Sequence, residues 1–167
     1  GEFIGRELVE MTRNIFPLSH KKEDTYLAGF SMGGYGAIRN GLKYHDTFGY
    51  IGAISAALLT DDLHNWGEGD DLLSSRSFAQ SCFGDLNKVI GSDMDPKFLI
   101  DDLIANDIEI PKIFMAVGDN DFLYNENIDY YNYLKSRNVD VEFRCSSGEH
   151  TWEFCNDYIK GFIEWLP

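Results

Sequence analysis

The sequence predicts an α/β fold in which about four mainly parallel strands are flanked by helices. Three short apolar runs are typical of strands buried in a parallel sheet: 25–30, 48–54 and 113–117. A fourth strand is expected at 139–144, where the residues have alternating character. Helical segments separate these strands, and this alternation is typical of a sheet that helices cover on both faces.

The helices follow from apolar spacing and from residues that cap or end a helix. Apolar residues recur at helical spacing from Ile4 to Phe16, and Pro17 then ends the first helix. Thr151 is expected to cap the last helix, which runs to Trp165. Further helices are predicted at 33–43 and 125–136.

Residues 57–110 differ in composition from the rest of the chain. Acidic loops surround two expected helices, near 72–83 and 96–106. We expect a helical insert here, within a single domain that spans 1–167. The acidic residues are Asp61-Asp62, Glu68 and Asp70-Asp71. Their pairs are expected to face solvent rather than to hold a cation.

Composition excludes several classes of function. A net charge of −14 opposes binding to nucleic acid, whose phosphates would be repelled. No apolar run approaches the roughly 20 residues that cross a membrane, and the first residues do not resemble a signal peptide. Cys82, Cys145 and Cys155 show no CxxC or zinc-like spacing, so we expect reduced core cysteines in a cytoplasmic protein.

The sequence from Gly29 to Gly33 matches the G-x-S-x-G nucleophile elbow of α/β-hydrolases. In that motif a serine, here Ser31, sits on a strained strand-to-helix turn that exposes its hydroxyl at the end of the sheet. We expect glycine at 29 and 33 because side chains there would collide in so tight a turn.

The helix that follows the serine should serve the same site. Gly34, Gly36 and Ala37 are expected to keep this helix close to the sheet. Its N-terminus adds a positive field, and the Met32 backbone N–H is expected to donate to an oxyanion.

A nucleophilic serine needs a base and an orienting carboxylate, which follow it along the chain in the order Asp or Glu, then His. His150 is the histidine that follows the late strands, so it is the expected base. The acid should follow the third strand, where order alone allows either Asp119 or Asp121. The same loop fails as an EF-hand because Tyr124 occupies the glycine position.

The other histidines do not suit the base position. They are His20 and His45, in polar sequence near the serine turn, and His64, in the acidic segment, which could approach a substrate.

Three motifs in this order carry a family resemblance, at 29–37, 118–124 and 148–154. The sequence GFSMGGYGA resembles the serine motif of the "Putative esterase" family, whose members include tributyrin esterases, S-formylglutathione hydrolases, and feruloyl and acetylxylan esterases. The loops GDNDFLY and GEHTWEF most resemble the tributyrin esterase branch. The resemblance implies that Asp121 is the acid and Asp119 a loop residue. Glu149 and Cys155 depart from the small residue and the Trp that family members often carry.

The resemblance implies a serine carboxylesterase that hydrolyses short-chain acyl esters, such as tributyrin-, acetyl- or feruloyl-like esters, through an acyl-enzyme on Ser31. The substrate would be a small-molecule or saccharide ester, and no cofactor or metal would be needed. The insert would line the pocket, with Trp66, Phe78 and Phe83 either in its wall or in the core. Two alternatives stay open: a thioesterase such as S-formylglutathione hydrolase, and a catalytically impaired fragment that acts only as a binding or scaffold protein.

The segment before the serine turn is shorter than the resemblance implies, because a single helix stands where the family has several strands. We therefore expect the C-terminal part of an α/β-hydrolase fold that lacks its N-terminal strands and its second oxyanion donor. The strand at 25–30 would then expose an unpaired edge, through which the chain would self-associate. Esterase activity of this chain alone would be weak or absent.

Overall fold

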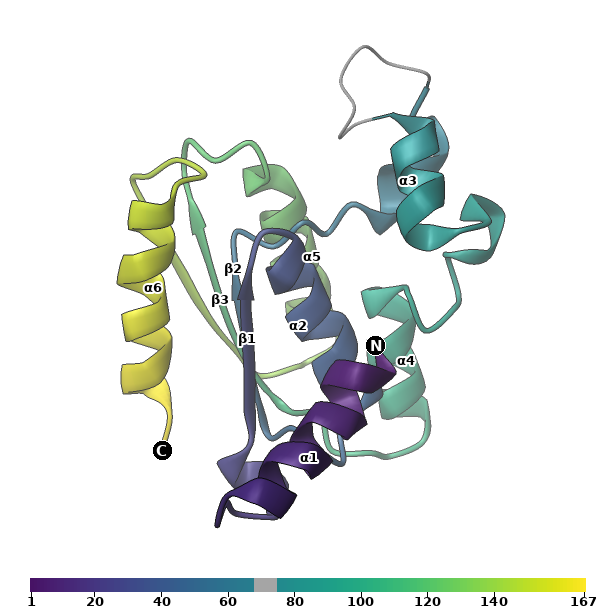
Figure 1. Ribbon diagram of the computed structural model, residues 1–167. Helices are drawn as coiled ribbons and strands as arrows, with labels where there is room; N and C mark the ends of the chain where they lie inside the picture. Colours follow the sequence, from purple (N-terminus) through teal and green to yellow (C-terminus); the bar gives the residue numbers. More distant parts are fainter. Residues whose placement is uncertain (68–74) are drawn as a thin grey trace.

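A computed structural model describes residues 1–67 and 75–167 of the chain. Its centre is a four-stranded parallel sheet with the strand order β1-β2-β3-β4 (Figure 1). The strands are β1 (Tyr26–Phe30), β2 (Tyr50–Ile54), β3 (Lys112–Gly118) and β4 (Val141–Ser146). The predicted parallel α/β architecture is therefore confirmed.

Strand β4 begins two residues later than its sequence predicts, because Asn138 and Val139 form the C-terminal cap of the preceding helix. Asn138 has a φ of 59°, in the left-handed region. The Val139 backbone N–H donates to the Leu134 carbonyl at 3.0 Å. Val139 therefore closes the last turn of the helix rather than opening the strand.

Helices cover both faces of the sheet, as Figure 1 shows. The helices on one face are α2 (Met32–Lys43), α4 (Pro96–Ala105) and α5 (Tyr124–Ser136). The other face is covered by α6 (Trp152–Trp165), whose Phe162 packs against Phe114. Alternating residues of β3 face opposite ways, so Ile113 and Met115 join the core under α2 while Phe114 joins the core under α6.

The predicted first helix divides into a π-helical turn, Phe3–Glu7, and α1, Leu8–Ile15. A Cβ on Gly5 would lie 2.2 Å from the Tyr44 ring, so glycine lets this turn pack against the end of α2. In contrast, α1 buries none of its side chains in the described structure, and Ile15 is 64% exposed. The apolar side chains of Met11, Ile15 and Phe16 are therefore left exposed in the described structure.

The segment between β2 and β3 contains short helices at Thr60–Asn65 and Leu86–Lys88, together with α3 (Arg76–Phe83) and α4. It has a small core of its own, made of Leu63, Ala79, Leu86 and Val89. The N-terminal part of the helix predicted at 72–83, and Glu68 and Asp70-Asp71, lie outside the described residues. None of the helices in the described ranges has the length and apolarity that a bilayer crossing requires.

Candidate active site

Ser31 lies between the end of β1 and the start of α2, where the chain turns sharply. Its φ is 59° and its ψ is −120°, a conformation that serine rarely adopts and that stores backbone strain. Two hydrogen bonds to the segment after β2 hold the turn: the Ser31 N–H donates to the Ile54 carbonyl, and the Ala57 N–H donates to the Ser31 carbonyl, each at 2.9 Å. The backbone thus has the strained strand-to-helix geometry that the motif predicts.

The glycines of the motif differ in what they make room for. A Cβ on Gly29 would lie 2.1 Å from the Gly33 carbonyl oxygen, and one on Gly34 would lie 2.9 Å from Ala56 Cα. A Cβ on Gly33 or Gly36, however, would meet no described atom within 4 Å. The predicted need for glycine is therefore confirmed at 29 and 34 and is wrong at 33 and 36, where the turn leaves open space on that side of the helix.

The acid and base expected from chain order lie together at the ends of β3 and β4. His150 Nδ1 is 3.0 Å from each carboxylate oxygen of Asp121. The Asp121 side chain is fully buried, and its Oδ1 also accepts the Leu123 backbone N–H at 2.8 Å. A buried carboxylate in contact with one ring nitrogen fixes the orientation of the imidazole.

Asp119, the alternative acid, instead contacts the backbone of the loop that contains His150, which we call the base loop. Its Oδ1 accepts the Gly148 N–H at 3.2 Å, and the neighbouring Asn120 N–H donates to the Gly148 carbonyl at 2.9 Å. A Cβ on Gly118 would lie 2.2 Å from that same carbonyl oxygen, so the two loops approach closely only because glycine is present. Asp119 therefore holds the base loop against the loop that contains Asp121, which we call the acid loop.

Two aromatic rings flank the His150 imidazole, a feature that the sequence reasoning missed. Phe30 stacks on it with ring centroids 4.6 Å apart, and Phe122 lies 4.5 Å away. Both rings are neighbours of motif residues, one before Ser31 and one after Asp121, so their position in the motifs is the signal that could have identified them. Contact with these two rings limits rotation of the His150 imidazole.

Ser31 and His150 line one hollow of about 560 Å³, together with Met32 and Trp152. The hydrogen bonds of the described residues do not include one between Ser31 and His150. The structure thus places the expected base in contact with the expected acid and brings Ser31 to the same hollow as His150.

Met32 is the first residue of α2, and its side chain is exposed. Its backbone N–H belongs to the first helical turn, whose N–H groups have no intrahelical acceptor. The positive end of the helix therefore faces the Ser31 turn.

The remaining histidines lie elsewhere. His20 precedes β1 and His45 follows α2, so both are at the opposite end of the strands from Ser31. His64 belongs to the short helix Thr60–Asn65, and its side chain lies outside what the structure describes.

A second, apolar pocket of about 330 Å³ also borders Ser31. Its described lining has no charged side chain and includes Trp66, Phe78 and Phe83. Trp66 and Phe83 also pack against the small core of the insert, so they serve both as pocket wall and as core. The aromatic residues that the sequence left between these two roles therefore line the pocket beside the serine.

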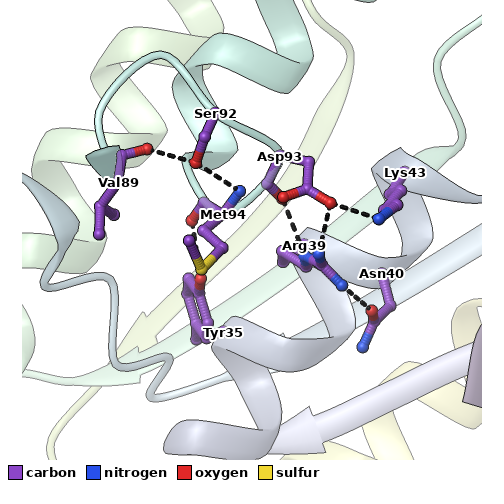
Figure 2. A network of polar contacts seen from close by, with 8 residues as sticks. All are labelled: Tyr35, Arg39, Asn40, Lys43, Val89, Ser92, Asp93 and Met94. Carbon is purple, nitrogen blue, oxygen red and sulfur yellow. Dashed lines mark hydrogen bonds and ion pairs between the residues drawn. The ribbon is translucent and has the colours of Figure 1, made fainter. Parts of the chain in front are cut away.

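Side chains on α2 fix the loop at 89–95 that follows the pocket wall (Figure 2). The Tyr35 hydroxyl donates to the Met94 carbonyl at 2.7 Å, and burial raises the pKa of this phenol. Arg39 Nη2 lies 2.7 Å from Asp93 Oδ2, and Lys43 Nζ donates to the same oxygen. The hydrogen bond from Lys43, followed by the charge of Arg39, lowers the pKa of Asp93. The insert is thus bound to the helix that begins at the serine.

Two of the three cysteines lie at the surface rather than in the core. All three cysteines lie in the described ranges and are free, but Cys82 and Cys145 are exposed, so the expected core position is wrong for both. Cys145 lies near the exposed end of edge strand β4, and Cys82 lines the apolar pocket.

No group of three His, Cys, Asp or Glu side chains within the described ranges is arranged to hold a metal ion.

Comparisons with known proteins agree with this geometry. The family model "Putative esterase" matches residues 1–154. An acetyl esterase of Caldicellulosiruptor saccharolyticus is 44% identical over 167 residues, which is 99% of this chain and 63% of the relative. The chain therefore spans less than two thirds of that relative.

Two solved structures from Staphylococcus aureus are also similar. The fluorophosphonate-binding serine hydrolase FphF is 35% identical with a TM-score of 0.82, over 96% of this chain and 60% of that one. The S-formylglutathione hydrolase FrmB is 35% identical with a TM-score of 0.81, over 96% and 61%. The fold is that of α/β-hydrolase esterases, and the chain belongs to the "Putative esterase" family.

Proposed function

We propose that this protein hydrolyses carboxylic esters through an acyl-enzyme on Ser31, with His150 as general base and Asp121 as the residue that orients it. The observation that carries the proposal is the shared hollow: Ser31 on its strained turn and His150 on its buried carboxylate both line it. Similarity to an acetyl esterase and to a fluorophosphonate-binding serine hydrolase supports the same chemistry.

In the proposed reaction, His150 Nε2 takes the proton of the Ser31 hydroxyl as the oxygen attacks the ester carbonyl. Asp121 accepts the Nδ1–H and stabilises the imidazolium. The Met32 N–H donates to the oxyanion of the tetrahedral intermediate. The proton then passes to the departing alcohol, and water attacks the acyl-enzyme with the same base.

The apolar pocket favours a small, uncharged acyl group. Its volume of about 330 Å³ lies at the low end of ligand pockets, which are typically about 300–1,000 Å³. A charged acyl group would lose its hydration there without gaining an ionic partner from the described lining. We propose short-chain acyl esters of small alcohols or sugars as substrates.

A thioesterase is the second candidate, because one of the similar structures is an S-formylglutathione hydrolase. The same residues would cleave either bond, so the leaving group must be tested directly. A panel of matched p-nitrophenyl acetate, acetyl thioester and acetyl amide substrates separates these activities in the protein at its full natural length. Faster turnover of the oxygen ester supports the proposal, faster turnover of the thioester supports the alternative, and no turnover supports a binding or scaffold role.

We further propose that the 167-residue chain self-associates. β1 lies at an edge of the sheet, with no strand on its other side among the described residues. A second copy would cover exposed apolar side chains here: Tyr26 on β1, and Ile15 and Phe16 near the end of α1.

The free thiols fit a reducing compartment, so we propose a cytoplasmic location for the protein.

A further inference from the structure

The turn that follows β2 is strained and directly supports the Ser31 turn. Ser55 has a φ of 44° and is completely buried, and its N–H donates to the Ala116 carbonyl at 2.7 Å. Ile54, just before it, and Ala57, two residues after it, form the two backbone hydrogen bonds to Ser31. A shift of this turn would therefore move the serine.

One buried side chain, Asn127 on α5, forms two hydrogen bonds to this turn. Its Oδ1 accepts the Ala56 N–H at 3.1 Å, and its Nδ2 donates to the Ala56 carbonyl at 2.9 Å. Asn127 is completely buried, so both bonds form away from water. Such a two-point contact fixes both the position and the orientation of the Ala56 peptide groups.

The same carboxamide also holds the acid loop. Nδ2 of Asn127 donates to the Leu123 carbonyl at 2.8 Å, and the Leu123 N–H in turn donates to Asp121 Oδ1, which contacts His150. The nucleophile turn and the acid loop, nearly a hundred residues apart in sequence, are thus connected through one amide group.

We propose that Asn127 is a positioning residue that fixes the Ser31 turn and the Asp121 loop relative to each other, without touching the substrate. This inference rests on the proposed function of Ser31, His150 and Asp121. Displacement of a reacting group by about 1 Å can cost on the order of 100-fold in rate, so a shared anchor for the two halves of the site has a large effect.

Asparagine is the residue type that this position requires. Its amide supplies two N–H donors and one acceptor, which match the two carbonyls and the one N–H that face it. Aspartate has the same shape but, when ionised, offers no donor and faces two carbonyl oxygens. Burial raises the pKa of such a carboxyl group, and the protonated form regains one donor.

The test measures the second-order rate of fluorophosphonate labelling in the protein at its full natural length, for wild type, Asn127→Ala, Asn127→Asp and Tyr130→Phe. Tyr130→Phe is the matched control, because it removes a buried hydrogen bond from the same helix, to Pro96 on α4. Circular dichroism and size-exclusion chromatography establish which variants are folded. Labelling is then repeated from about pH 8 to about pH 6.

We expect Asn127→Ala to lower the labelling rate about 10- to 100-fold and Tyr130→Phe to change it less than about twofold. The rate of Asn127→Asp relative to wild type should rise as pH falls, because protonation restores a donor. Folded Asn127 variants that label like wild type would overturn the inference alone, and so would failure of both variants to fold, because Asn127 would then be a folding residue. A folded wild-type protein that does not label would instead overturn the proposed function.

Discussion

His150 Nδ1 lies 3.0 Å from both carboxylate oxygens of Asp121, although the two residues come from loops after different strands. The carboxylate is fully buried, whereas the imidazole is partly exposed and borders the hollow that contains Ser31. One ring nitrogen thus contacts Asp121, which leaves the other for the proton transfer from Ser31 that we propose.

Asp121→Asn should lower kcat by about 10³- to 10⁴-fold, by analogy with other triads, because an amide cannot stabilise the imidazolium and favours the wrong tautomer. Steady-state hydrolysis of p-nitrophenyl acetate measures the effect. Asp119→Asn is the control, since Asp119 accepts a backbone N–H of the base loop and does not contact His150 in the described hydrogen bonds. It should cost less than about tenfold, and a larger loss from Asp119→Asn than from Asp121→Asn would reverse the assignment.

Phe78→Ala should shift the acyl preference toward longer chains, because Phe78 lines the apolar pocket without belonging to the small core of the insert. We expect wild type to prefer two- to four-carbon acyl groups and the variant to gain roughly tenfold on about eight carbons relative to acetate. Kinetics on p-nitrophenyl esters of increasing length measure the shift. Phe98→Ala, at an exposed position on α4, should leave the preference unchanged. A wild-type preference for ten carbons or more would contradict the proposed substrate class.

Asp93→Asn should weaken the attachment of the insert to α2 and raise KM for short acyl esters more than it lowers kcat. The pKa of Asp93 is lowered in the folded state, so its contribution to stability is present above the unfolded pKa of about 3.9 and is lost as pH falls through the folded value. Urea unfolding of wild type and variant should therefore differ at pH 7, and the difference should shrink as pH falls below the unfolded pKa. A difference that stays constant as pH falls would show that the charge of Asp93 contributes nothing.

Light scattering on the 167-residue chain should reveal dimers or larger species. Ile15→Glu places a charge on the exposed apolar face of the first helix and should shift the population toward monomer at equal concentration. Lys135→Glu, on α5, is a control for the added negative charge and should not do so. A monodisperse wild-type monomer would contradict the proposal.

The regular elements could be predicted from sequence because each has a local cause. Thr151 caps α6 by accepting the Phe154 N–H, as expected, and Pro17 follows the end of the first helix. Chain order and motif resemblance also selected Asp121 and His150 as the expected acid and base, and the structure places these two side chains in contact.

Other features depend on contacts between distant segments, which no local pattern records. Asn127 was an ordinary helical residue in the sequence, and its role follows from carbonyl and N–H groups of Ala56, 71 positions away. Gly33 was expected to relieve a collision, yet in the structure Gly29 needs the space and Gly33 faces none. The burial of Cys82 and Cys145 was mispredicted because Cys82 lies on α3 in the insert and Cys145 on strand β4 at the end of the strand order, and neither position is set by the local sequence.

Fluorophosphonate labelling of Ser31 tests the central claim most directly, in the protein at its full natural length and with mass-spectrometric identification of the modified residue. The strained turn, the neighbouring His150–Asp121 pair and similarity to a fluorophosphonate-binding hydrolase all predict a single adduct on Ser31. Ser31→Ala should abolish it, and His150→Ala should slow it by at least about 100-fold. Equal labelling of wild type and Ser31→Ala, or an adduct on another residue, would contradict the account.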